Sequence, residues 1–128
     1  MGYETKRVVV VDDSSVMRQI IKNNLKQLGF VITNIYDAED GAAGLKKLSE
    51  DITVDLIVSD WNMPRMTGID FLRAVRADEK LKAVPFLMVT SEADKAKIIE
   101  AVQAGVSQYI VKPFSSVQLS DKIKQIFK

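Results

Sequence analysis

The feature that most constrains the fold of this chain is a regular alternation of short apolar runs with longer segments of helical periodicity. Residues 7–11 form a run rich in valine, and Ser14 to Leu28 then repeats apolar side chains at helical spacing, followed by Gly29. A glycine at that position is typical of a helix C-terminus. The same alternation continues to the last residues without a linker, low-complexity tract or internal repeat. The pattern therefore predicts one domain built from repeated strand–helix units.

We expect five strands and five helices in strict alternation. The expected strands cover residues 7–11, 32–36, 54–59, 85–89 and 108–111. The expected helices cover residues 14–28, 38–48, 68–77 and 93–104, with a last helix that Ser115 or Ser116 caps and that buries Leu119, Ile123, Ile126 and Phe127 on one face. This order predicts an α/β fold, a doubly wound parallel sheet with helices on both sides.

Composition removes several classes of function. Hydrophobic residues make up 47% of the 128 residues, enough for a core, and the net charge of +1 argues against a nucleic-acid-binding surface spread over the molecule. Cysteine and histidine are both absent, which excludes disulfides, the commonest zinc ligand and a phosphohistidine on this chain. Without a signal-peptide pattern or an apolar run of membrane-spanning length, we expect a cytoplasmic protein that contacts no membrane.

Charged and hydroxyl side chains collect where the expected strands end. The residues at these strand ends are Asp12, Asp13, Asp60, Thr90, Ser91 and Lys112. Ligands of open parallel sheets bind beyond the carboxyl ends of the strands, so one site could contain all of them. Each has an ordinary alternative: Asp13 or Ser14 could cap a helix, Thr90 or Ser91 could cap the fourth helix, and Lys112 could be a solvated loop lysine. Capping alone, however, requires neither three acids at one edge nor a lysine opposite them.

The acidic cluster predicts a divalent cation. Two unit charges about 4 Å apart repel each other by roughly 4 kcal/mol at an effective dielectric near 20, so three carboxylates need neutralisation. Oxygen ligands favour Mg²⁺, Mn²⁺ or Ca²⁺ over zinc. The glycine-rich motifs GxGxxG and GxxxxGK[ST] are absent, and two aspartates in the first turn would repel a phosphate unless a metal were present.

Four segments in this order carry a family resemblance. They are VVVVDDSS, VSDWNMP, MVTSEA and YIVKPF, each at an expected strand end. Together they are similar to a response-regulator receiver domain, from about Lys6 to the C-terminus, and within that family most resemble the single-domain CheY-type chemotaxis regulators. The resemblance implies a single receiver domain over residues 1–128, a flavodoxin-like (βα)5 fold and the strand order 2-1-3-4-5.

The resemblance also implies roles for matching residues. Asp60 would be the phosphorylation site, and Asp13 and Asp60, with the backbone carbonyl of Asn62, would bind Mg²⁺, or alternatively Mn²⁺. Asp12 would hold a metal-bound water. Thr90 and Lys112 would hydrogen-bond the phosphoryl oxygens, so that Asp60, Thr90 and Lys112 form the catalytic set.

Further consequences of the resemblance concern switching and lifetime. Thr90 would move towards the phosphoryl group and admit the ring of Tyr109, whose ordinary alternative is a half-buried strand aromatic. Asn62 and Glu92 would set the lifetime of the phosphorylated state.

We expect Trp61 to be exposed, because it follows a strand, and the Lys112–Pro113 bond to be a candidate cis peptide.

The implied function is that of a two-component response regulator. A histidine kinase would phosphorylate the chain, which is not itself an enzyme but assists its own phosphorylation and dephosphorylation. A basic face on the fourth helix, fifth strand and fifth helix would bind a flagellar motor switch protein or another target; its residues are Lys95, Lys97, Gln108, Lys122 and Lys124. A phosphatase partner fits this scheme, and the chain would be a monomer.

One alternative within the same chemistry is a phosphorelay intermediate that passes the phosphoryl group to another histidine protein. A small-molecule phosphatase is a weaker alternative, because haloacid-type phosphatases have a second acid two residues after the nucleophile, where this chain has Asn62.

Overall fold

The computed structural model describes residues 2–50, 53–91 and 94–128. The strands are β1 (Val8–Val11), β2 (Ile35–Ala38), β3 (Leu56–Asp60), β4 (Phe86–Thr90) and β5 (Gln108–Val111). The helices are α1 (Ser15–Gln27), α2 (Gly41–Ser49), α3 (Gly68–Ala77), α4 (Lys95–Ala104) and α5 (Ser116–Ile126), and a short 3-10 helix covers Ile32–Asn34. Within the described ranges, no helix is both long and apolar enough to cross a membrane.

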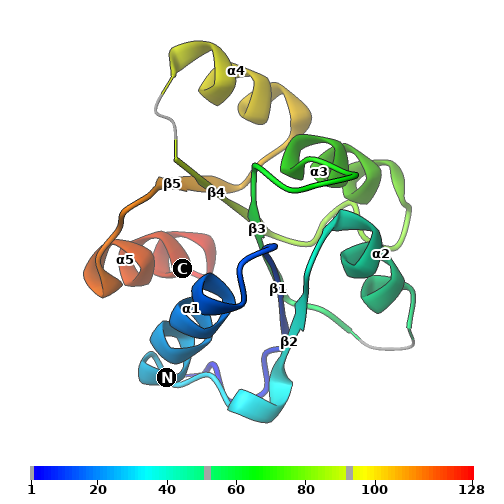
Figure 1. Cartoon of the computed structure of the whole chain (residues 1–128). Coiled ribbons are helices and arrows are strands. Elements are labelled where there is room, and N and C mark those ends of the chain that lie inside the picture. The colour runs from blue at the N-terminus through cyan, green and yellow to red at the C-terminus, as the bar shows by residue number, and fades with distance from the viewer. Residues whose placement is uncertain (1, 51–52, 92–93) are drawn as a thin grey trace.

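The strands form one parallel sheet in the order β2-β1-β3-β4-β5. Helices α1 and α5 cover one face of this sheet, and α2, α3 and α4 cover the other (Figure 1). The chain crosses over after β2, so the strand order reverses between β1 and β3. The doubly wound flavodoxin-like fold and its strand order are as the sequence and the resemblance predicted.

Strand β1 contributes side chains to both hydrophobic layers of the core. Its alternate side chains point to opposite faces, so Val9 and Val11 pack with α2, α3 and α4, whereas Val8 and Val10 pack with α1 and α5. All four valines are fully buried. A run of four valines is therefore what a strand buried on both faces requires.

Local capping explains several helix boundaries. Ser14 accepts a hydrogen bond from the Met17 N–H at 3.2 Å, so Ser14, rather than Asp13, caps α1. Ser115 forms a capping box with Gln118 at the start of α5, which resolves the choice between Ser115 and Ser116. Helix α4 is capped by Asp94, so the alternative in which Thr90 or Ser91 caps it is excluded. Ala93 lies outside the described residues.

The region of β2 and α2 differs most from the expected boundaries. The predicted strand at 32–36 is wrong over its first half, because Ile32–Asn34 forms a 3-10 helix and β2 extends to Ala38, which pairs with Val11. Helix α2 accordingly begins at Gly41, where the Asp40 carboxylate caps it by accepting the Ala43 N–H at 2.8 Å. The apolar stripe predicted for α1 includes Ile20, but this residue is 44% exposed in the structure.

Candidate functional site

Three carboxylates meet at the carboxyl edge of the sheet. Asp12 and Asp13 follow β1, Asp60 ends β3, and one carboxylate oxygen of each lies within 4.8 Å of the others. Asp12 and Asp60 are buried, whereas Asp13 is exposed. The parallel pairing of β1 with β3 brings these chain segments together, although Asp12 and Asp60 are 48 positions apart in the sequence. The predicted acidic cluster is therefore present as a geometric group.

Lys112 follows the edge strand β5, and its side chain reaches the acidic cluster. Its Nζ is 3.0 Å from Asp60 Oδ1 and 3.6 Å from Asp12 Oδ2. The lysine follows β5, and its backbone N–H donates to the Thr90 carbonyl at 2.7 Å, which continues the pairing of β4 with β5. The following Lys112–Pro113 bond is cis. The structure thus brings Asp12, Asp13, Asp60 and Lys112 together, as the sequence predicted.

The surroundings of Asp12 disfavour its ionised form. Burial raises the pKa of Asp12 above its ordinary value, and the charges of Asp60 and Asp13 act in the same direction. The Ser14 N–H, which donates to Asp12 Oδ1 at 2.8 Å, and the Lys112 ammonium group partly oppose this rise in the pKa. The carboxylate is therefore less stable as an anion here than it would be in water.

The other oxygen of Asp12 gives a test of whether the site suits a cation. Asp12 Oδ2 is buried and accepts no hydrogen bond from the described part of the chain. A buried anionic oxygen without a hydrogen bond is costly, and a cation beside it removes that cost. The donor set consists of hard carboxylate oxygens, which fits Mg²⁺ and its chemical relatives. The residues present therefore fit a divalent metal.

Arg18, in α1, supports the same loop, and no pattern in the sequence distinguishes it from other surface arginines. Its guanidinium group donates to the backbone carbonyl of Asp12 at 2.6 Å and to Asp37 Oδ2 at 3.0 Å. Asp37 lies in β2, and Lys22 is a second cation beside it, at 3.6 Å. Arg18 thus links the turn after β1 to the neighbouring strand.

The loop after β3 carries Asn62 and is tightly folded at its base. The Trp61 N–H donates to Asp60 Oδ1 at 2.9 Å, and the Gly68 N–H donates to the Trp61 carbonyl at 2.8 Å. A Cβ atom at Gly68 would lie 2.2 Å from the Asp60 carbonyl oxygen, so only glycine fits this close approach. Asn62 itself is exposed, two residues after Asp60 in the chain.

The expectation that Trp61 is exposed is wrong, because the residue is only 5% exposed and belongs to the core on the side of α2, α3 and α4. The ammonium group of Lys97, from α4, lies 5.0 Å from the centroid of its ring. Trp61 directly follows the last residue of β3, but its side chain packs into the core, so a position just past a strand does not by itself imply exposure. The chain's one tryptophan is therefore a buried neighbour of Asp60.

Thr90 and Tyr109 lie in the two adjacent strands β4 and β5. Thr90 is buried at the end of β4, one residue beyond Val89, which pairs with Asp60. Tyr109 is half-buried, packs against the same core as Trp61, and has Lys122 Nζ 5.4 Å from its ring centroid. Ser91 is exposed. Glu92 lies outside the described residues.

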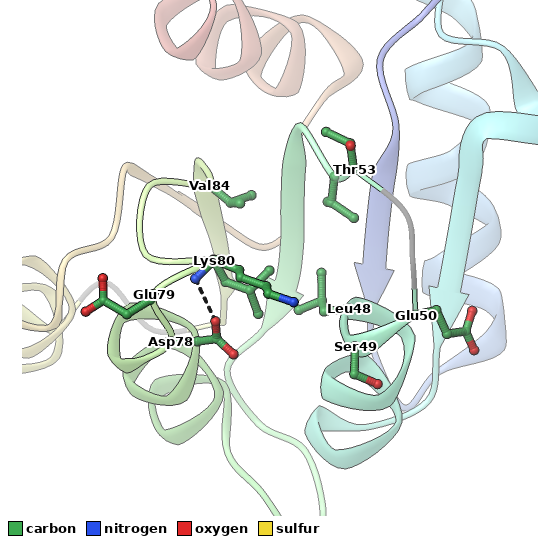
Figure 2. Close-up of a pocket in the computed structure, with 10 residues that line it drawn as sticks. Leu48, Ser49, Glu50, Thr53, Asp78, Glu79, Lys80 and Val84 are labelled. Atoms are coloured by element: carbon green, nitrogen blue, oxygen red, sulfur yellow. Dashed lines mark hydrogen bonds between the residues drawn. The ribbon is translucent and has the colours of Figure 1, made fainter.

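A cavity of about 760 Å³ lies elsewhere, at the opposite end of the sheet. Figure 2 shows it between the end of α2, the residues that precede β3 and the turn after α3, where the Asp78 carboxylate accepts the Lys80 N–H at 2.8 Å. Its lining residues include none of the acids of the cluster. The candidate site is therefore the open rim at the carboxyl ends of the strands, and this cavity is separate from it.

Comparisons with known proteins agree with the fold and with the arrangement of the rim. Residues 8–124 match the family described as the response regulator receiver domain. The chain is 56% identical over 122 residues to the chemotaxis protein CheY of Pseudomonas aeruginosa, covering 95% of this chain and 96% of that protein. It is 50% identical to the chemotaxis protein CheY-3 of Vibrio cholerae, covering 95% of this chain and 92% of that protein.

Solved structures show the same similarity. The chemotaxis protein CheY4 of Vibrio cholerae superposes with a TM-score of 0.86 at 35% identity, covering 94% of this chain and 98% of that one. The receiver domain of a signal transduction histidine kinase from Syntrophus aciditrophicus gives a TM-score of 0.84 at 24% identity, covering 95% of this chain and 89% of that one, and supports the fold alone. The chain belongs to the response regulator receiver family, and its close homologues are CheY chemotaxis proteins.

Proposed function

We propose that this receiver domain is a chemotaxis switch that accepts a phosphoryl group on Asp60 from a phosphohistidine of a partner histidine kinase. One observation carries the proposal: Asp60 lies within one group with two further carboxylates and with the Lys112 ammonium group 3.0 Å away. Such a site combines a nucleophilic carboxylate with a cation that can stabilise charge on a transferring phosphoryl group.

In the proposed transfer, an Asp60 carboxylate oxygen forms a bond to phosphorus while the phosphorus–nitrogen bond of the phosphohistidine breaks. The electron pair of that bond goes to the histidine nitrogen of the partner. Lys112 and the Trp61 N–H both contact Asp60 Oδ1, so we expect Oδ2 to attack. Lys112 then turns to the new phosphoryl oxygens, and Thr90, at the end of the adjacent strand, donates its hydroxyl to them.

Asp13 and Asp60, with the Asn62 backbone carbonyl, would hold a Mg²⁺ ion directly, and Asp12 would hold one of its waters. Mn²⁺ is the expected substitute, because it accepts the same oxygen ligands. When bound, the metal supplies positive charge to the carboxylates and to the phosphoryl oxygens. Asn62, two residues after the acceptor, and Glu92, two residues after Thr90, are the residues that we expect to control access of water and thus the phosphate lifetime.

Output would pass through the face formed by α4, β5 and α5. Lys122 Nζ lies 3.5 Å from Gln108 Oε1 on this face, while Lys95 and Lys124 are exposed. A basic face suits an acidic or amphipathic segment of a partner. The proposed target is a flagellar motor switch protein, reached in the cytoplasm by a monomer whose Thr90 and Tyr109 change packing on phosphorylation.

The direct experiment is to incubate the protein with acetyl phosphate and Mg²⁺ and to measure the intact mass. We expect one added phosphoryl group in the wild type, none in Asp60→Asn, and none in the wild type after the metal is chelated. A phosphoryl adduct that persists in Asp60→Asn would assign the acceptor elsewhere.

Target binding needs a separate experiment. Protein treated with beryllofluoride, a phosphoryl mimic, should bind a purified motor switch protein more tightly than untreated protein, and Tyr109→Ala should reduce that gain. A phosphorelay intermediate is not favoured, because relatives aligned over nearly their whole lengths are chemotaxis proteins. Efficient transfer of the phosphoryl group to a histidine phosphotransfer protein, without affinity for the motor, would reverse that preference.

A further inference from the structure

The loop between β3 and α3 is fastened to the start of α2 by an ion pair. Arg65, in the loop, donates from Nε to Asp40 Oδ2 at 3.1 Å, and its Nη2 contacts the same oxygen. Asp40 is the residue that caps α2, and its other oxygen accepts the Ala43 N–H at 2.8 Å. One carboxylate therefore has two attachments, one to its own helix and one to the loop.

The ion pair is asymmetric in burial. Asp40 is 4% exposed, whereas the Arg65 side chain is 66% exposed. The Ala43 N–H and the Arg65 guanidinium group lower the pKa of Asp40 below its ordinary value, so the carboxylate remains ionised over the physiological range. The Asp40 carboxylate is held in position by its hydrogen bond at the start of α2, and its ion pair with Arg65 attaches the loop to that position.

The backbone of Arg65 shows how closely the loop is held. Its φ of 66° lies in the left-handed region, which a residue with a Cβ adopts only at a steric cost. The neighbouring residue Met66 packs against Gly41, where a Cβ atom would lie 2.7 Å from Met66 Sδ. The loop therefore follows a path against the start of α2 that requires a backbone conformation unfavourable for arginine, and the ion pair holds it there.

The position of Asn62 between two attachments gives this ion pair a role. At the base of the loop, the Gly68 N–H donates to the Trp61 carbonyl at 2.8 Å. At its far side, Arg65 is tied to Asp40. Asn62, whose backbone carbonyl is the proposed metal ligand, lies in the chain between these two points and is otherwise exposed. Fixing both ends of a short segment limits the positions that its carbonyl can take.

We propose that Arg65 is a positioning residue for the metal site: its ion pair with Asp40 holds the Asn62 carbonyl in place relative to Asp13 and Asp60 before the metal arrives. This inference rests on the metal site of the proposed function. A preformed ligand set binds a cation without first ordering a loop, so its affinity is higher. Arg65 itself contacts Asp40 and not the acids of the cluster.

The test compares the wild type with Arg65→Gly. Glycine adopts the left-handed backbone at no steric cost, so this variant removes the ion pair without adding strain. The affinity for Mg²⁺ is read from the fluorescence of Trp61, the chain's one tryptophan. We expect roughly a tenfold rise in the Mg²⁺ dissociation constant, the lower end of the effect of removing groups that support metal ligands.

The sign of this change separates positioning from simple electrostatics. Arg65→Gly removes a positive charge from the loop beside the acidic site, which by itself would tighten Mg²⁺ binding. A matched control is Arg73→Gly, which removes a charge from α3 where the arginine contacts Asp70 and Glu100. We expect Arg73→Gly to leave the Mg²⁺ affinity within about twofold of wild type, an effect typical of an exposed and screened charge.

Two metal-free readouts complete the design. In the absence of Mg²⁺, Arg65→Gly should speed amide hydrogen exchange in residues 62–66 and change the midpoint of urea unfolding little, because loss of the exposed ion pair and relief of the left-handed backbone strain oppose each other. Unchanged exchange, or a Mg²⁺ affinity equal to or tighter than that of the wild type, would overturn the proposal. If the wild type itself gives no response to Mg²⁺ while exchange in the variant is faster, the metal site of the proposed function fails and the fastening of the loop stands.

Discussion

Lys112 Nζ lies 3.0 Å from Asp60 Oδ1, so the proposed phosphoacceptor is paired with a cation of its own chain. The lysine side chain is 22% exposed, whereas that of Asp60 is 6% exposed. The ammonium group also lies 3.6 Å from Asp12 Oδ2, which accepts no hydrogen bond from the described residues. Lys112 therefore neutralises part of the acidic cluster, and its removal should have opposite effects on metal binding and on phosphoryl transfer.

Replacing Lys112 by methionine should tighten Mg²⁺ binding and slow phosphorylation. Loss of one positive charge beside the cluster should lower the Mg²⁺ dissociation constant by roughly three- to tenfold. Loss of a group that stabilises the transferring phosphoryl group should reduce the rate of modification by acetyl phosphate by about 100-fold or more. Fluorescence titration and intact-mass kinetics measure the two effects, with Lys112→Arg as the variant that keeps the charge. A weaker affinity for Mg²⁺ in Lys112→Met would contradict this electrostatic account.

Replacing Asp12 by asparagine should stabilise the metal-free protein. Burial raises the pKa of Asp12, so its ionised form costs stability at neutral pH, and a neutral side chain removes that cost. We expect a rise of a few degrees in melting temperature without metal, and a smaller increase on adding Mg²⁺ than in the wild type. Asp70→Asn, at an exposed acid of α3, is the control. A lower melting temperature for metal-free Asp12→Asn would show that its bond to the Ser14 N–H outweighs the repulsion.

Replacing Gly68 by alanine should damage both the fold and the site. The added methyl group would lie 2.2 Å from the Asp60 carbonyl oxygen and 2.8 Å from the Trp61 Cα, so the backbone must shift. Such overpacking costs roughly 1–3 kcal/mol, and here the displaced atoms belong to the proposed acceptor. The midpoint of urea unfolding should fall, and the rate of modification by acetyl phosphate should decrease. Full modification at wild-type stability would mean that the loop adjusts without moving Asp60.

The ion pair of Asp40 predicts a particular pH dependence. The pKa of Asp40 is lower in the folded protein than its ordinary value of 3.8, so its ionised form stabilises the fold. This contribution is complete above about pH 5 and is lost as the pH falls through the folded-state pKa, below the ordinary value. The difference in unfolding free energy between the wild type and Asp40→Asn should therefore be constant from pH 7 to 5 and shrink below pH 4. Urea titrations across this range would refute the idea if the difference grew on acidification.

The fold could be predicted from the sequence because its elements carry strong local signals. Four consecutive valines in β1 indicate a strand buried on both faces, and the alternation of strands and helices implies a parallel sheet. Strand order came from the family resemblance, since periodicity does not determine which strands are neighbours. The boundary of β2 was displaced because Ile32 is apolar but exposed, at 41%, in a 3-10 helix.

Residues of the proposed site could be predicted only where a charged or hydroxyl side chain lies at the end of a predicted strand. Asp12, Asp60 and Lys112 each follow or finish a strand, so topology alone places them at one rim. Trp61 also follows a strand, but its side chain packs into the core with residues from distant parts of the chain, which no local pattern encodes. The pairing of Arg65 with Asp40 joins residues 25 positions apart through the path of a loop, and neither residue differs in the sequence from an ordinary surface charge or helix cap.

The division of the core by β1 has a consequence for how such a protein can diverge. One hydrophobic layer is shared by α1 and α5, and the other by α2, α3 and α4, with the sheet between them. A substitution in one hydrophobic layer does not contact the other layer, because the fully buried strand β1 lies between them. The two faces of the molecule can therefore accumulate changes independently over generations, one acquiring new recognition properties while the other remains as it was.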